Sequence, residues 1–229
     1  MIKYTITYNR YSYCLNNPLK YTDPTGQMFS PYYDKLGNFL GVDENGFKGN
    51  IYITTKDAFQ ASAMNGIANS MLLQANKETR WIKDYPVNLL SLEAQSKIMT
   101  HILQDMSDIN LSKLYNGEVS INSLQTINGE KVTYNNADDY NRAGYWKTDD
   151  EQHRVTAMTG ELNSLGTVEA VKSYLGIHEY YSHGVLEIPG RENQKAHQQA
   201  YRNQYNHWTY KYLLDWQKKE IYDRMNGKP

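Results

Sequence analysis

The spacing between two histidines, His178 and His183, is the strongest local constraint on how this chain of 229 residues can fold. An α-helix advances by about 100° per residue, so two residues five positions apart diverge by roughly 140° around its axis. A regular α-helix therefore cannot direct both side chains to one point. Either a π-bulge absorbs one extra residue, a feature that tends to occur at functional sites, or the helix ends near residues 182–184 and a loop brings His183 round.

Composition limits the other ways of holding the fold together. The one cysteine, Cys14, excludes an intramolecular disulfide and a zinc cage built from cysteines. The fold must rest on its core, and any metal site must use His, Glu or Asp. A formal net charge of -1 predicts no general attraction to nucleic acid or membranes. No apolar run is long enough for a membrane span, and the first residues lack the apolar core of a signal peptide.

The apolar pattern predicts an α+β fold, with N-terminal strands and hairpins among helices and a helical C-terminal third that carries the histidines. The turn residues 36–38 predict a hairpin, and residues 50–55 alternate like a half-buried strand. The other predicted elements are helices at 56–80, 91–107, 167–184 and 193–225, a hairpin within 118–136, a strand at 152–158 and a turn at 159–164. Aromatic residues three or four apart predict an inward stripe on the last helix, namely Tyr201, Tyr205, Trp208, Tyr212 and Trp216.

The histidines predict a metal site on the C-terminal helices. A catalytic zinc ion normally takes three protein ligands and keeps one position for water. His178 and His183 supply two ligands, and His197, on the inward stripe of the next helix, is the expected third. Glu187 and Glu192 are the alternative third ligands. Zinc is the expected cofactor.

The residue after the first histidine, Glu179, is the expected general base. Zinc lowers the pKa of bound water to about 7, and a nearby carboxylate can take the proton and return it to the leaving group. Tyr201 and His207 are candidates for stabilising the oxyanion. Glu161 and Asp215 are candidates for holding the outer nitrogen of a ligand histidine.

Residues 10–26, RYSYCLNNPLKYTDPTG, closely resemble the end of the Rhs/YD-repeat core, the shell-forming part of bacterial polymorphic toxins. In that family a variable toxin domain follows this segment. The resemblance implies the end of the Rhs core at 1–27, a linker with short strands at 28–55 and a toxin domain at 56–229. It also implies a cognate immunity protein and the core shell as partners, and secretion into a target cell by a specialised delivery system.

The segment HEYYSH, residues 178–183, resembles the H-E-x-x-G-H motif of the dipeptidyl peptidase three family of zinc enzymes. Ser182 stands where that motif has glycine, and serine lacks the full backbone freedom of glycine. The last 70 residues or so are also similar to toxin domains behind Rhs cores that are described as metallopeptidases. These resemblances imply a zincin-like, zinc-dependent peptidase that acts on a protein or peptide.

Two other classes of function stay open. A metal-dependent nuclease could use His183 or His197 to activate water, although residues 191–229 are only mildly basic, with eight Lys or Arg against four Asp or Glu. A non-enzymatic binding module could use its tyrosine-rich surface, since the chain has 21 tyrosines. In that case Glu179 and His183 would form only an ordinary surface pair on a helix.

Overall fold

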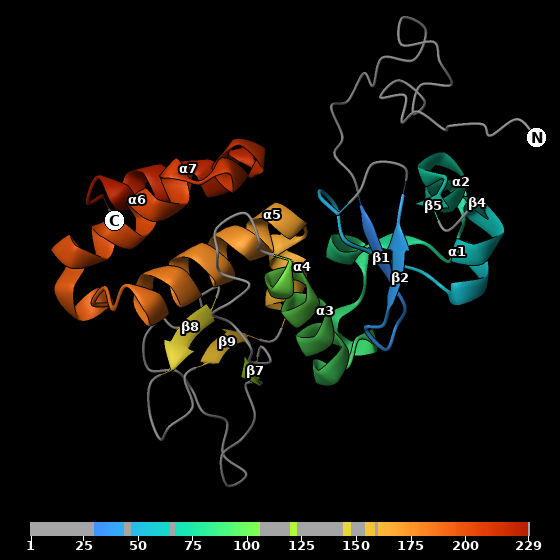
Figure 1. Ribbon diagram of the computed structural model, residues 1–229, viewed down its shortest axis with the longest axis horizontal. Coiled ribbons are helices and arrows are strands. Elements are labelled where there is room, and N and C mark those ends of the chain that lie inside the picture. Colours follow the sequence, from blue (N-terminus) through green and yellow to red (C-terminus); the bar gives the residue numbers. More distant parts are fainter. Residues whose placement is uncertain are drawn as a thin grey trace, which may run out of the picture.

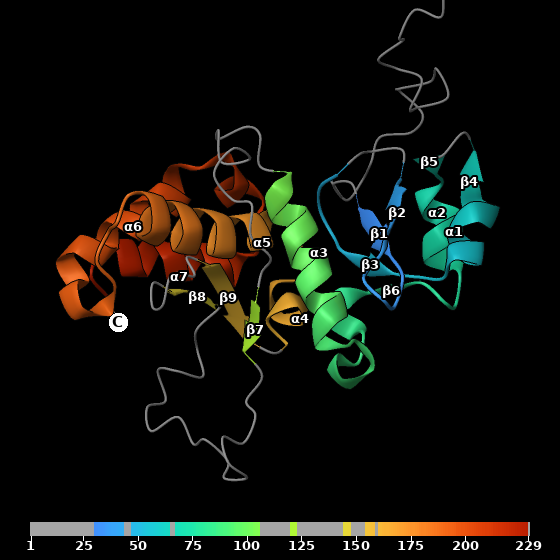
Figure 2. The same ribbon diagram turned by 60° about the horizontal axis from the view of Figure 1, so that its bottom comes forward.

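The structure is a computed structural model that describes residues 30–43, 47–64, 67–105, 120–122, 144–147, 154–158 and 160–228. Two halves lie side by side, with helix α3 (Leu92–Gln104) between them (Figures 1 and 2). Strands and helices occur in both halves and the C-terminal region is helical, so the predicted α+β class is confirmed. The segment that resembles the Rhs core lies outside the described residues.

A four-stranded sheet of order β2-β1-β3-β6 organises the N-terminal half. Its strands are β1 (Pro31–Tyr33), β2 (Phe39–Val42), β3 (Tyr52–Ile53) and β6 (Arg80–Trp81). β1 and β2 are antiparallel neighbours, which confirms the predicted hairpin. Its turn needs glycine, because Gly37 has a φ of +79° and a Cβ there would lie 2.6 Å from the carbonyl oxygen of Ala94 on α3.

The strand predicted at 50–55 is buried on both faces and not half-buried. Ile51 and Ile53 enter the main core together with α3. Tyr52 points into a smaller cluster, where it stacks on Tyr32 at 5.3 Å between ring centroids. Residues 31–43 and 47–53 thus supply both strands and core side chains. The linker boundary inferred from the resemblance stays a prediction.

The single helix predicted at 56–80 was wrong. The chain forms α1 (Lys56–Ser62), the antiparallel pair β4 (Ala63–Met64) and β5 (Ile67–Ala68), and α2 (Ser70–Ala75). α1 ends because Ala63 turns to an extended backbone. A new helix begins where the side chain of Asn69 accepts a hydrogen bond from the Leu72 amide, the usual N-cap arrangement.

Helix α3 confirms the helix predicted at 91–107. Ser91 caps its N-terminus by accepting from the Ala94 amide, and Ile98 and Ile102 are fully buried one turn apart. A second sheet follows, with the order β7-β9-β8. Its strands are β7 (Ser120–Asn122), β8 (Gly144–Lys147) and β9 (Arg154–Met158).

β9 confirms the strand predicted at 152–158. β7 falls on the first arm of the hairpin predicted within 118–136, but it pairs in parallel with β9, and the second arm lies outside the described residues. The predicted turn at 159–164 was wrong, because Gly160, with a φ of +83°, starts the short helix α4 (Glu161–Leu165).

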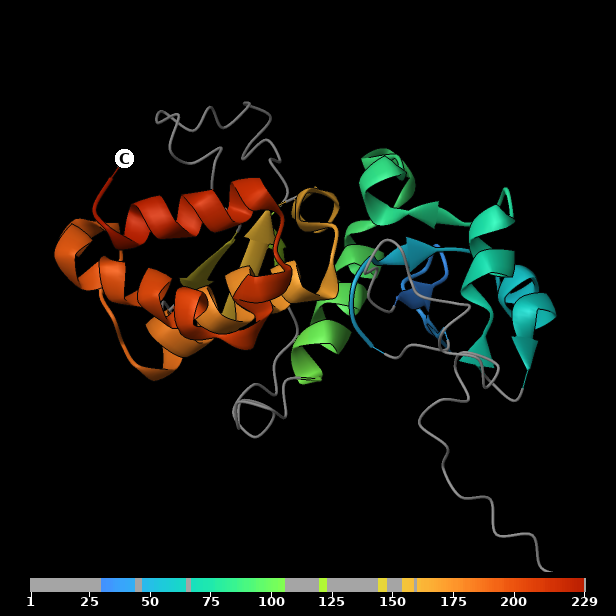
Figure 3. The same ribbon diagram turned by 90° about the horizontal axis from the view of Figure 1, so that it is seen from above.

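Helices cover the second sheet. α5 (Val168–Val171) runs directly into a π-helix, Lys172–Val185, which packs against β8 and β9. α6 (Gln194–Asn206) packs on the π-helix, and α7 (Asp215–Met225) packs on α6 (Figure 3). Within the described part of the chain, no helix is both long and apolar enough to cross a bilayer.

The long helix predicted at 193–225 was wrong, because a 3-10 turn at Trp208–Tyr212 separates α6 from α7. His207 and Leu213 take extended backbone conformations on either side of that turn. The prediction of an inward aromatic stripe along this helix was therefore also wrong. Tyr205 is 39% exposed and Trp216 is 50% exposed, whereas Tyr201 packs against the core.

Candidate metal centre

The π-helix resolves the spacing of the two histidines. Its backbone hydrogen bonds join residues five apart, so His178 and His183 lie one turn apart on the same face. The wider turn is not confined to a single π-bulge, because a π-helix of 14 residues contains both histidines. The centroids of the two rings are 5.1 Å apart.

His197 comes to this pair from α6. Its ring centroid lies 5.0 Å from that of His178 and 5.0 Å from that of His183. One ligand nitrogen from each of the three histidines lies within 4.8 Å of the other two, which is close enough for all three to hold one ion. His178 is buried, while His183 and His197 keep part of their surface in contact with solvent.

The face of α6 that meets the π-helix repeats at helical spacing. His197, Tyr201 and Gln204 stand four and three residues apart, so they follow one side of the helix. The Tyr201 ring lies 4.5 Å from the His178 ring and 5.1 Å from the His197 ring, between centroids. The tyrosine thus forms one wall of the histidine cluster.

Ser182 has a structural use at the position where the resembling motif has glycine. Its hydroxyl donates to the carbonyl oxygen of Ile177 at 2.8 Å and accepts from the Asn203 side-chain amide at 3.0 Å. The second bond ties the π-helix to α6. Ser182 is not among the described residues with positive φ, so the backbone here does not need glycine.

The outer nitrogen of His183 is held by the chain that follows the π-helix. Nδ1 lies 2.6 Å from the carbonyl oxygen of Ile188. A carbonyl can only accept, so Nδ1 carries the proton and Nε2 keeps a free lone pair. Two features turn the chain back so that the Ile188 carbonyl faces His183. Glu187 has a φ of +51°, which is unusual for a residue other than glycine. The Ile188 amide donates to the backbone carbonyl oxygen of Ser182.

Burial keeps the three imidazoles neutral. It lowers the pKa of His178 well below its ordinary value, and the neighbouring His183 and His197 lower it further. Burial, followed by the charge of His183, lowers the pKa of His197 to about 4. The pKa of His183 is also lowered by burial. Because metal ligation requires neutral imidazole, these rings are in the required state at neutral pH.

Glu179 follows His178 directly and is half-buried. Burial raises the pKa of the nearby Tyr201 to about 12, and the negative charges of Glu220 and, most weakly, Glu179 add to that rise. The charge of Glu179 therefore has a weak electrostatic effect on a residue that lines the histidine cluster.

The alternative third ligands lie outside the histidine group among the described residues. Glu192 accepts a hydrogen bond from the Gly190 amide at 2.7 Å. Its pKa is lowered by backbone hydrogen bonds from its own amide and that of Gly190, and less strongly by His183 and His197, so it borders the site. Glu187 is exposed and serves the turn described above.

Two other candidate residues have different surroundings from those expected. His207 caps the 3-10 turn, with Nδ1 2.9 Å from the Thr209 hydroxyl, and is not part of the histidine group. Glu161 belongs with Glu220, whose charge adds to burial in raising the Glu161 pKa to about 8. The outer nitrogens of His178 and His183 are held by Gln204 and Ile188 and not by Glu161. Asp215 is exposed at the start of α7.

Sequence reasoning missed Gln204. Its side-chain oxygen lies 2.8 Å from Nδ1 of His178, and it is fully buried between α6 and the π-helix. The helical spacing from His197 and Tyr201 was a usable signal, since a glutamine seven residues after a ligand lies on the same face. The Ile188 carbonyl gave no such signal, because any residue could supply it.

No family model, curated protein or solved structure matches this chain. The chemical argument therefore rests on the geometry itself. Three neutral imidazoles converge, two of them partly open to solvent, and Glu179 follows the first of them in the sequence. Imidazole nitrogen is a ligand type that suits zinc and several other divalent ions.

Proposed function

We propose that residues 56–229 of this chain are the toxin domain of an Rhs-type effector and act as a zinc-dependent peptidase. His178, His183 and His197 hold the ion, and Glu179 is the general base. The convergence of three histidine nitrogens within 4.8 Å is the observation that carries the proposal. Three protein ligands with one remaining position are typical of catalytic zinc, whereas structural zinc sites are closed by four.

The ligand set favours activation of water. All three donors are neutral, so an ion held by His178, His183 and His197 would keep its full positive charge and would lower the pKa of a bound water. Partial exposure of His183 and His197 gives that water and a substrate a route from solvent. The buried His178 holds the opposite side of the site.

Glu179 takes the proton of the attacking water and passes it to the leaving amine, so that one carboxylate serves both halves of the hydrolysis. Its position directly after a ligand histidine supports this role. The neutral Tyr201 hydroxyl, with its raised pKa, is available to stabilise the oxyanion. A protein or peptide is the proposed substrate.

The toxin context rests on the resemblance of residues 10–26 to the end of an Rhs core. It carries three further proposals: a shell formed by the core, a cognate immunity protein, and secretion into a target cell by a specialised system. None of these depends on the metal chemistry, and the chemistry does not depend on them.

Elemental analysis of protein purified without chelator tests the metal centre first. One equivalent of zinc is expected in the wild type and in Glu179→Gln, and none in His178→Ala. His207→Asn is the matched control, because asparagine can also cap the 3-10 turn and the residue lies outside the group. Metal content equal to wild type in His178→Ala would refute the site.

Parallel assays of casein, DNA and RNA degradation then decide the reaction. The proposal expects proteolysis that Glu179→Gln abolishes. Zinc-dependent cleavage of nucleic acid alone would replace the peptidase with a nuclease. A zinc-free protein that captures a partner would support the binding module.

A further inference from the structure

We propose that Gln204 is a positioning residue that fixes His178 in the tautomer needed for metal binding, and that Ser173 sets the orientation of Gln204. The inference rests on the proposed metal centre and adds the residue that prepares it. Gln204, on α6, is fully buried against the π-helix.

Hydrogen bonds at Ser173 decide which way the glutamine amide points. The Gln204 nitrogen lies 3.2 Å from the Ser173 carbonyl oxygen and 3.1 Å from its hydroxyl. The carbonyl can only accept, so the NH₂ group must face Ser173. The side-chain oxygen of Gln204 consequently faces His178.

That orientation fixes the proton on His178. The Gln204 oxygen lies 2.8 Å from Nδ1 of His178 and can only accept, so Nδ1 must carry the hydrogen. The Nε2 lone pair then points toward His197, whose Nε2 is 2.9 Å away. His178 Nε2 therefore accepts a hydrogen bond from the Nε2–H of His197. His178 and His183 both have an unprotonated Nε2 before any ion arrives, and the proton that His197 shares with His178 has to leave when an ion binds.

The π-helix is what aligns these groups. Ser173, His178 and His183 are each five residues apart, which is the repeat of its hydrogen bonds. In a regular α-helix the same three residues would diverge by roughly 140° per step. Ser173 and His178 could not then both reach the one glutamine.

Two variants of Gln204 distinguish the loss of its hydrogen bond to His178 from a change in side-chain packing. Gln204→Leu keeps the approximate volume and removes the acceptor, whereas Gln204→Glu keeps an oxygen for His178. Gln199→Leu, an exposed change five residues earlier on α6, is the control. Loss of an outer hydrogen-bond partner of a ligand histidine typically weakens metal affinity by roughly 10- to 100-fold.

Zinc affinity, measured by competition with a chelator, is expected to fall by that factor in Gln204→Leu. It should stay within about tenfold of wild type in Gln204→Glu and remain unchanged in Gln199→Leu. An unchanged zinc affinity in Gln204→Leu would overturn the inference.

Nitrogen-15 NMR of the metal-free wild type needs no variant to fold. It should report His178 with its proton on Nδ1, and the opposite tautomer would overturn the inference. This result is independent of the proposed function. A wild type that binds no zinc would refute the metal centre while the tautomer measurement still decides the role of Gln204.

Discussion

Replacing Glu161 by glutamine should make the protein more stable in alkaline solution. Glu161 is the first residue of α4. Burial of its carboxyl group, with a further contribution from the charge of Glu220, raises its pKa to about 8. Glutamine has nearly the same shape and carries no charge, so it removes the cost of ionising this group in the folded protein.

The sign and size follow from the two pKa values. The folded protein holds this proton more tightly than the unfolded chain, where the pKa is 4.5. The stabilisation is complete below that value and is lost as the pH rises through about 8. At about 1.4 kcal/mol per pKa unit the shift sets an upper limit of roughly 5 kcal/mol. Because the residue keeps some contact with water, we expect about 2–3 kcal/mol at pH 9.

Thermal unfolding followed by circular dichroism from pH 5 to pH 9 measures this effect. For a chain of this size the Glu161→Gln variant should gain roughly 5–10 °C over wild type at pH 9, and little at pH 5. Glu93→Gln is the control, because a hydrogen bond from Lys97 lowers the Glu93 pKa and the charged form is the favoured one. Melting curves of wild type and Glu161→Gln that stay parallel across the range would refute the reasoning.

Four further outcomes are expected. Glu179→Gln should lower hydrolysis by roughly 10²- to 10⁴-fold without loss of zinc, and an active variant would exclude it as the base. Lys172→Met should lower the free energy of unfolding in urea by about 1–3 kcal/mol. This is less than the loss of a fully buried ion pair would cost, because its partner Asp105 is half exposed. An unchanged unfolding midpoint would contradict this. Ser182→Ala should cost about 1–2 kcal/mol by the same assay, since two hydrogen bonds are lost, and a neutral effect would contradict their role. Zinc affinity should be nearly constant from pH 8 to pH 6 and fall near pH 4, where His197 takes up a proton; a fall that begins at pH 7 would contradict the lowered pKa.

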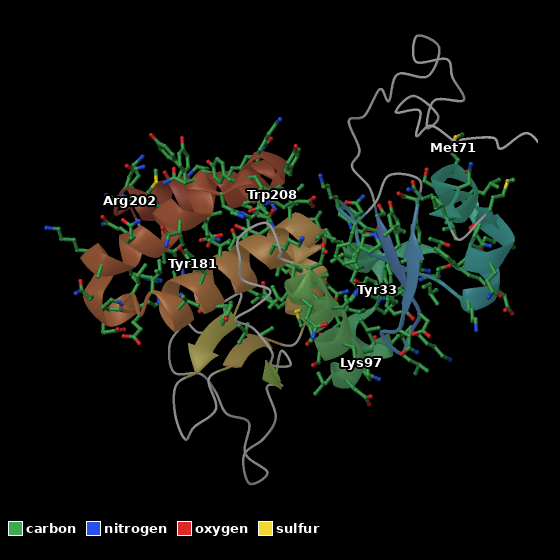
Figure 4. All side chains as sticks on the ribbon, in the orientation of Figure 1. Tyr33, Met71, Lys97, Tyr181, Arg202 and Trp208 are labelled. Atoms are coloured by element: carbon green, nitrogen blue, oxygen red, sulfur yellow. The ribbon has the colours of Figure 1, made fainter. Side chains whose placement is uncertain are left out.

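The side chains labelled in Figure 4 belong to both halves of the molecule and to the junction between them. The side chains labelled Tyr181, Arg202 and Trp208 belong to the helices around the histidine cluster, and Met71 lies at the far end of the N-terminal half (Figure 4). Tyr33 on β1 and Lys97 on α3 lie at the junction between them. Tyr33 is fully buried and its hydroxyl lies 3.0 Å from Nδ1 of His101, so a polar contact links the first sheet to α3.

Local patterns predicted the elements whose ends carry their own signals. Ser91 precedes a strongly periodic segment and begins α3, and Gly37 permits the turn between β1 and β2. The continuous helix predicted at 56–80 failed because its apolar residues also suit a short antiparallel strand pair, and Asn69 caps a second helix. Periodicity alone cannot choose between these when the segments are short.

By itself the sequence determined which residues can bind a metal: one cysteine left histidine and carboxylate, and His178, His183 and His197 fell on neighbouring helical segments. Only the tertiary structure decided that the helix has a five-residue hydrogen-bond repeat, and that Gln204 and the Ile188 carbonyl hold the outer nitrogens. The physical reason is that helix period and side-chain proton positions depend on contacts with α6 and the following loop. The contact with Gln204 joins residues 26 positions apart, and the Ile188 carbonyl, although only five residues from His183, belongs to a backbone that any residue could supply, so no local pattern encodes either contact.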